Sequence, residues 1–181
     1  MVRRYLLMMA GVMLYFFPAR SQTLVQGLEK TEIAMLLRKL QKIPTLSCIA
    51  DRVDFQYPWK REDLFQLQKE QFTCFQQLMF EQIFALFSTE HGLAAWDQSL
   101  LKQLLSNLYR SLKNLEPVEE GSLACLSLGI ALRKYFRRIN LYLNQKKYSD
   151  CAWEIVRWEI QFTFFPYNNY QSESSHKRRN E

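Results

Sequence analysis

The side chains with the most distinctive chemistry are four cysteines and two histidines. The cysteines contain no Cys-x-x-Cys pair, and His91 and His176 lie far apart, so the spacing predicts no zinc site or other metal site. In an oxidising compartment an even number of cysteines instead predicts disulfides, and four cysteines allow three connectivities. The four are Cys48, Cys74, Cys125 and Cys151.

Enzyme motifs are missing from the sequence. It has no glycine-rich phosphate loop, no Gly-x-Ser-x-Gly elbow and no two Glu-x-x-His motifs that could together hold a di-metal site. A hydrolytic triad would need His91 or the tail residue His176, and neither has a suitable setting. Asp51 and Asp54 lie in a non-periodic stretch, where carboxylates typically fix turns by hydrogen bonds. We therefore predict no enzyme, no catalytic residue and no cofactor.

The first 21 residues have the pattern of a secretory signal peptide. Arg3 and Arg4 precede an apolar run over residues 5–17, and Ala19-Arg20-Ser21 is a small-x-small cleavage signal. The run is too short to span a membrane, and no second long apolar run follows it. We expect a secreted, extracellular protein without stable membrane insertion.

The charge balance excludes one class of partner. The whole chain carries a formal net charge of +6, but without Arg3, Arg4 and Arg20 the balance is 21 basic against 18 acidic residues. So small an excess, on a secreted protein, argues against nucleic-acid binding. The remaining chain is long enough for one domain with a real core, expected over residues 22–166. Residues 167–181 are polar and are expected to form a disordered tail.

Leucines at spacings of three and four predict an all-α fold. Glycine and proline are scarce, and Pro44 limits the first helix. Residues 45–62 show no sustained period but are rich in aromatic side chains, which is typical of a crossover connection. The expected architecture is a five-helix cytokine-like bundle with a long crossover first connection. Its helices are predicted at residues 24–42, 63–87, 93–116, 122–144 and 151–166.

The last predicted helix has aromatic residues on two sides. Trp153, Val156 and Ile160 form an ordinary core stripe, whereas Trp158 and Phe162 fall roughly opposite them, together with Phe165. An aromatic outer face predicts a binding surface. The alternatives are that these rings cover the first connection or form a homodimer contact.

Several segments together resemble the type I interferons. They are residues 48–55 (CIADRVDF), 87–89 (FST), 94–97 (AAWD), 133–139 (RKYFRRI), 141–143 (LYL) and 146–157 (KKYSDCAWEIVR). The resemblance covers nearly all of the chain after the leader. It implies a helical cytokine that brings together two chains of one cell-surface receptor and triggers antiviral JAK-STAT signalling.

The resemblance also implies a disulfide and two receptor surfaces. Cys48 is expected to pair with Cys151, which would hold Arg52 beside Arg157. The high-affinity receptor chain is expected to contact Ile49, Arg52, Arg157, Trp158, Gln161 and Phe162. The low-affinity chain is expected to contact Phe84, Leu100, Leu105, Tyr109 and Arg133. Trp158 and Phe162 differ from the smaller and basic residues usual in the family, and Leu105 replaces a tyrosine found in several members.

A second family disulfide, from the N-terminus to the end of the third helix, has no cysteines here. No cysteine lies near Gln22, and Val118 stands where its partner would be. Cys125 projects onto the core face of the fourth predicted helix, and Cys74 lies at the margin of the core stripe of the second. We predict that these two form a replacement bridge.

The basic residues over 133–138 have two interpretations. They form either a solvated helix face or a weak glycosaminoglycan-binding patch.

Two other functions also fit the sequence pattern as a whole. One is a helical cytokine with a different receptor, and the other is a basic membrane-active host-defence protein.

Overall fold

The protein folds as a helical bundle. The computed structural model describes residues 31–116 and 123–177, and these residues form helices and connections but no strand. The expected all-α fold is confirmed. The elements are a helix at residues 31–39, the 3₁₀ helix η1 (Thr45–Asp51), α2 (Arg61–Phe65), α3 (Lys69–Phe87), α4 (Glu90–Ala95), α5 (Gln98–Asn114), α6 (Leu123–Gln145) and α7 (Asp150–Lys177). The predicted leader over residues 1–21 and the predicted start of the first helix lie outside the described residues.

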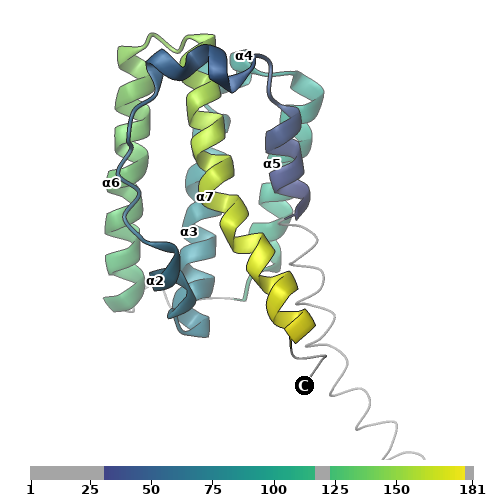
Figure 1. The fold of residues 1–181 in the computed structure, drawn as a ribbon, viewed down its shortest axis with the longest axis vertical. Helices are drawn as coiled ribbons and strands as arrows, with labels where there is room; N and C mark the ends of the chain where they lie inside the picture. Colours follow the sequence, from purple (N-terminus) through teal and green to yellow (C-terminus); the bar gives the residue numbers. More distant parts are fainter. Residues whose placement is uncertain (1–30, 117–122, 178–181) are drawn as a thin grey trace, which may run out of the picture.

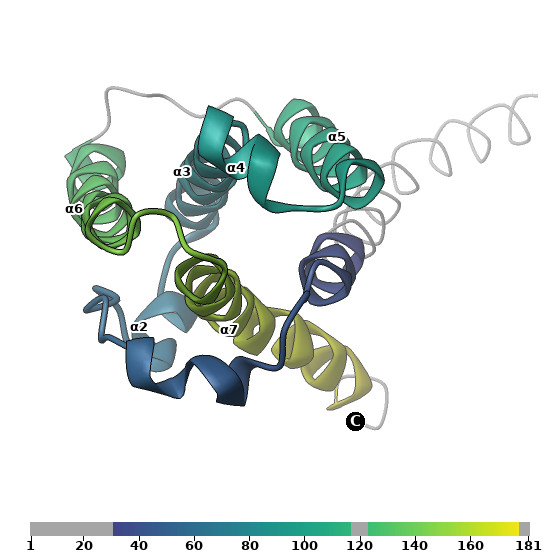
Figure 2. The same ribbon diagram turned by 90° about the horizontal axis from the view of Figure 1, so that it is seen from above.

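The first connection crosses the whole length of the bundle, as the sequence predicts. After the first helix, the chain passes over the beginning of α7 as η1 and then descends between α6 and α7 to α2 (Figure 1). The first helix and α3 consequently run in the same direction, and α5 and α7 run in the opposite one. Seen from above, η1 lies across the outer side of α7, so that α7 is covered both by the bundle and by the connection (Figure 2).

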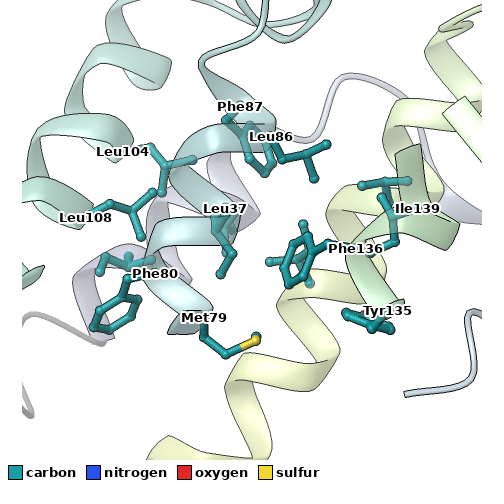
Figure 3. Packing of buried hydrophobic residues seen from close by; sticks show 14 of the residues in the cluster. Leu37, Met79, Phe80, Leu86, Phe87, Leu104, Leu108, Tyr135, Phe136 and Ile139 are labelled. Carbon is teal, nitrogen blue, oxygen red and sulfur yellow. The ribbon is translucent and has the colours of Figure 1, made fainter. Parts of the chain in front are cut away.

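The core consists of the apolar stripes that the leucine spacing predicts. Figure 3 shows Leu104 and Leu108 of α5 on one side of the core and Phe136 and Ile139 of α6 on the other. All four side chains are buried, because a helix that is apolar at every third or fourth position turns those residues inward. The other predicted core residues that are buried are Ile33, Leu36, Leu37, Leu40, Phe75, Met79, Ile83, Leu86, Leu101, Leu132, Leu143, Trp153, Val156 and Ile160.

Two predicted helices are each divided by a local cap. The helix predicted over residues 63–87 is broken after α2, because Gln68 is extended and its backbone N–H donates to the Gln71 side chain at 3.1 Å, which starts α3. The helix predicted over residues 93–116 is broken at Trp96. There the Asp97 carboxylate accepts a hydrogen bond from the Leu100 N–H at 2.9 Å and starts α5.

The close contact of α4 with the end of α3 depends on Gly92. A Cβ atom at this position would lie 2.6 Å from the Phe87 carbonyl oxygen and 2.9 Å from that of Leu86. The Gly92 N–H also donates to the Thr89 hydroxyl at 3.0 Å, which caps α4. A larger residue would force α4 away from α3, so this turn requires glycine for space.

The last helix is longer than predicted. α7 continues past Pro166 to Lys177, although the sequence predicts an end near Pro166. A proline removes one N–H from the helix ladder and crowds the preceding turn, which kinks a helix as well as breaking one. Residues 167–177 contain neither proline nor glycine to end the helix.

Two disulfides connect distant segments. Cys48 of η1 is bonded to Cys151 in the first turn of α7, with 5.2 Å between their Cα atoms. Cys74 of α3 is bonded to Cys125 of α6, with 5.8 Å between their Cα atoms. Both predicted pairings are therefore confirmed, including the replacement bridge.

Candidate functional site

A buried ion pair lies at the centre of the predicted receptor surface. The Arg157 guanidinium donates from Nε to Glu154 Oε2 at 2.8 Å and from Nη2 to Glu154 Oε1 at 2.6 Å. It also donates to the Leu37 carbonyl of the first helix at 3.1 Å and to the Gln161 side chain. Thr45 of the first connection donates to Glu154 Oε1 at 2.6 Å. One charged pair thus connects three segments of the chain.

The expected surface role of Arg157 is therefore wrong. The family resemblance placed it on the receptor surface, but only 2% of this residue is exposed, because its guanidinium is held inside by Glu154 and by the Leu37 carbonyl of the first helix. The two arginines that were expected side by side also diverge: Arg157 points inward, whereas Arg52 is exposed on the surface. Sequence reasoning overlooked Glu154, although its spacing of three residues from Arg157 is a recognised signal for a helical ion pair.

Three residues spaced by four, two in α6 and one just after its end, hold the extended part of the first connection. Arg138 donates to the carbonyls of Phe55 and Gln56, both at 2.8 Å. One turn later, the Tyr142 hydroxyl donates to the Asp51 carbonyl at 2.9 Å, and burial raises the pKa of this hydroxyl to about 12. Lys146 forms an ion pair with the Asp51 carboxylate at 2.6 Å. Because Arg138 turns toward the connection, it does not belong to the exposed basic face of α6.

The outer surface above this network is an aromatic stack capped by a cation. The Arg52 guanidinium carbon lies 4.8 Å from the centre of the Trp158 ring. Trp158 also stacks on Phe162, with 5.3 Å between ring centres and 14° between ring planes. Ile49 of η1 is 62% exposed, Phe162 is 58% exposed, and Gln161 is partly exposed. The structure therefore leaves five of the six residues predicted for this surface accessible.

A carboxylate lies partly buried beside this stack. Glu159 accepts a hydrogen bond from the Tyr135 hydroxyl at 2.9 Å. Burial raises the pKa of the Glu159 carboxyl above its ordinary value of 4.5, and the nearby charge of Asp54 raises it further. The Tyr135 hydrogen bond and the charge of Arg52 oppose this shift but do not cancel it. Burial likewise raises the pKa of the Tyr135 hydroxyl, which therefore remains a donor at neutral pH.

The second predicted surface contains an apolar groove formed by α3, α4 and α5. It has a volume of about 540 Å³ and is lined by Phe84, Leu93, Gln98, Leu101, Lys102, Leu105, Ser106 and Tyr109. The structure thus brings together three of the five predicted residues, Phe84, Leu105 and Tyr109. Leu100 is partly buried against the core, and Arg133 is exposed on α6; neither lines the groove.

The described residues offer few other kinds of site. Within residues 31–116 and 123–177, no three His, Cys, Asp or Glu side chains gather closely enough to hold a metal ion. Over the same ranges, no helix combines the length and the apolar character needed to cross a membrane. The exposed surfaces are therefore the features to compare with known proteins.

Comparison with known sequences identifies one family. The family model of the interferon alpha/beta domain matches residues 23–174. Interferon alpha-2 of Equus caballus is 44% identical over 152 residues, which cover 80% of this chain and 83% of that protein. Interferon alpha-7 of Homo sapiens is 43% identical over 145 residues, covering 76% and 77%. Interferon omega-1 of Homo sapiens is 40% identical over 160 residues, covering 84% and 82%.

A solved structure has the same fold. Zebrafish interferon 2 superposes with a TM-score of 0.65 over 76% of this chain and 94% of that chain. The two sequences are 20% identical over this alignment, so the comparison supports the helical arrangement alone.

The buried position of Arg157 predicts a loss of stability when it is replaced. Arg157→Ala would leave the Glu154 carboxylate buried without its partner, which should lower the free energy of unfolding by about 3–5 kcal/mol. Urea unfolding followed by circular dichroism measures this. The matched control is the exposed Arg52→Ala, which should cost less than about 1 kcal/mol. If Arg157→Ala kept its stability but lost receptor affinity, Arg157 would be a surface contact with the receptor and not a buried ion-pair partner.

The raised pKa of Glu159 predicts a pH-dependent contribution to stability. The folded state holds this proton more tightly than the unfolded chain, so the contribution is complete below about pH 4.5 and is lost as the pH rises through the folded pKa. Glu159→Gln keeps an acceptor for Tyr135 but cannot ionise. It should therefore be more stable than the wild type at pH 7, with the difference shrinking toward pH 4.5. Urea unfolding across this range tests the prediction against the exposed control Glu81→Gln, which should show no such trend.

Proposed function

The chain belongs to the interferon alpha/beta family, and on this basis we propose that it is secreted and binds both chains of the type I interferon receptor. It is a type I interferon-like antiviral cytokine and not an enzyme. Its action is then the joining of two receptor chains by binding energy. Their approach activates the kinases on their cytoplasmic segments and starts JAK-STAT signalling.

The exposed stack of Arg52, Trp158 and Phe162 is the observation that carries the proposal for the high-affinity chain. Binding hot spots are enriched in tryptophan and arginine, and these residues typically lie near the centre of an interface. Here an arginine and a tryptophan are in contact and accessible, and Ile49 adds exposed apolar surface on the adjacent η1. Arg157 supports the surface from below as a positioning residue, because its guanidinium is fully engaged inside the protein.

The groove between α3, α4 and α5 supports the proposal for the low-affinity chain. Tyr109 is 54% exposed at its edge, and the Lys113 ammonium lies 4.9 Å from the centre of the Tyr109 ring. In the view from above, α4 and α5 lie across the bundle from η1 (Figure 2). Two receptor chains could therefore bind at the same time without sharing a contact surface. Leu100 and Arg133 belong to this proposal as residues at its margin.

Receptor-dependent signalling in cells tests the proposal. The purified protein should induce phosphorylation of the STAT factors in cells of the source species, and cells lacking the high-affinity chain should not respond. Arg52→Ala should weaken binding to that chain by about 1–3 kcal/mol, the usual scale of a hot spot. Tyr109→Ala should reduce signalling while leaving that affinity unchanged, because it lies on the other surface.

Two results would contradict this proposal. If the folded wild-type protein induced no STAT phosphorylation in either cell line, a helical cytokine with a different receptor would be favoured. Disruption of lipid vesicles by the protein, without receptor-dependent signalling, would favour a membrane-active host-defence protein. Lys39→Ser, on the exposed side of the first helix, serves as a control that should change neither readout.

A second, weaker activity is favoured by the composition of α6. This helix contains no acidic residue, and Arg133, Lys134 and Arg137 are all exposed on it. We propose that this face binds sulfated glycosaminoglycans at the cell surface, since a row of cations without neighbouring acids attracts polyanions. Lys134→Ser combined with Arg137→Ser should elute from a heparin column at a lower salt concentration than the wild type.

The control for the heparin experiment removes the same charge elsewhere. Lys39→Ser combined with Lys113→Ser takes two cations from the first helix and α5 and should elute later than the α6 double variant. Equal elution of the two double variants would show that heparin responds only to net charge and not to the face of α6.

A further inference from the structure

The stack on the predicted high-affinity surface has a geometry that favours one kind of contact. Trp158 contacts both Arg52 and Phe162: the guanidinium carbon lies 4.8 Å from its ring centre, and the nearly parallel phenylalanine ring centre lies at 5.3 Å. A guanidinium that covers an aromatic ring still directs its N–H groups outward in its own plane. Arg52 can therefore donate hydrogen bonds along its edge while its flat side remains against Trp158.

This stack is fixed before any partner arrives. Trp158 and Phe162 are one helical turn apart on α7, and Arg157, which directly precedes Trp158, is anchored to Glu154 and to the first helix. Arg52 follows η1 directly, and η1 is bonded to α7 through Cys48–Cys151. Rings held in this way lose little side-chain entropy when a partner binds, which is the usual advantage of preorganised aromatic anchors.

The surroundings of the stack are apolar. Leu46 and Ile49 of η1 and the following Val53 are all exposed large hydrophobic residues. With the described residues, Arg52 forms no ion pair, so its edge donors remain accessible. The surface thus combines a flat apolar platform with one cationic edge, and over residues 150–163 of α7 the one arginine or lysine, Arg157, is buried.

We propose that Trp158 and Phe162 determine which receptor chain this protein accepts. This inference rests on the proposed function. The Trp158–Phe162 platform takes an apolar side chain of the receptor, and the Arg52 edge binds a carboxylate or a backbone carbonyl beside it. A receptor that offers a basic side chain at this position is disfavoured, because that cation would face the cation of Arg52. Specificity then arises from an attractive platform and a repulsive edge together.

A second copy of this chain fits the surface less well. In a two-fold symmetric contact the same patch meets itself, so two Arg52 side chains would approach each other. Glu159, a carboxylate close enough to feel the charge of Arg52, is partly buried and accepts a hydrogen bond from Tyr135. It is therefore poorly placed to compensate the arginine of a second copy. The receptor is therefore the occupant to which the proposal commits.

Surface plasmon resonance on the immobilised ectodomain of the high-affinity receptor chain tests the proposal. Phe162→Ala should weaken binding about 10–100-fold, mainly through faster dissociation. This fold-change should be nearly the same at 0.15 M and about 0.5 M NaCl, because an apolar contact is not screened. The matched control is Leu141→Ala on α6, whose side chain is 52% exposed and lies outside both proposed receptor surfaces; its affinity should be unchanged.

A second pair of variants separates recognition from folding. Trp158→Phe keeps a flat ring and should retain most of the affinity, whereas Trp158→Ala should lose at least as much as Phe162→Ala. Circular dichroism and thermal unfolding show whether each variant is folded. Equal losses for Trp158→Phe and Trp158→Ala would overturn the platform, because its ring face would then contribute nothing specific.

The remaining outcomes distinguish this inference from the function on which it rests. If the wild type bound the receptor chain and Phe162→Ala bound it with the same affinity, the selectivity of the stack would be overturned but the receptor assignment would remain. Failure of the wild type to bind would overturn both. A wild-type dimer in light scattering that Phe162→Ala converts to a monomer would assign the surface to a second copy and overturn the proposal.

Discussion

The buried guanidinium of Arg157 is the interaction on which the rest of this structure depends. A charge in the interior is tolerated only when its hydrogen bonds are satisfied, and here the partners come from Glu154, Gln161 and the first helix. Thr45 then completes the environment of Glu154 from the first connection. These contacts require the connection to cross α7, so the topology of the bundle and the ion pair depend on each other.

The crossing is reinforced by bonds at several points along the connection. Cys48–Cys151 joins residues 103 positions apart, and closing so long a loop restricts the unfolded chain by a few kcal/mol in the chain-entropy model. Arg138 and Tyr142 of α6, with Lys146 just after it, then hold the segment that follows. A surface built from two distant parts of the sequence thereby becomes rigid, which lowers the entropic cost of binding a partner.

The sequence predicts those parts of the fold that follow from local periodicity. The leucine stripe of α5 and the Leu132–Phe136–Ile139 stripe of α6 repeat every three or four residues, and they are buried as expected. Arg157 was misplaced because the family resemblance put it among the receptor contacts. It lies one helical turn after the core residue Trp153, so its spacing already favours the buried side of α7. The breaks before α3 and α5 were missed for a different reason: single capping side chains at Gln71 and Asp97 decide them.

The exposed aromatic rings of α7 can be understood from the fact that this helix is covered on two sides. The core covers one side of this helix and η1 covers another, so only a narrow strip remains on which the protein can present side chains. A small contact area needs residues that contribute much free energy each, and large aromatic rings do so. Exposed rings also promote aggregation, but Arg52 covers one face of Trp158 with a charged group and leaves Phe162 as the main exposed ring. The same stack therefore limits unwanted association and keeps a flat apolar contact accessible to a partner.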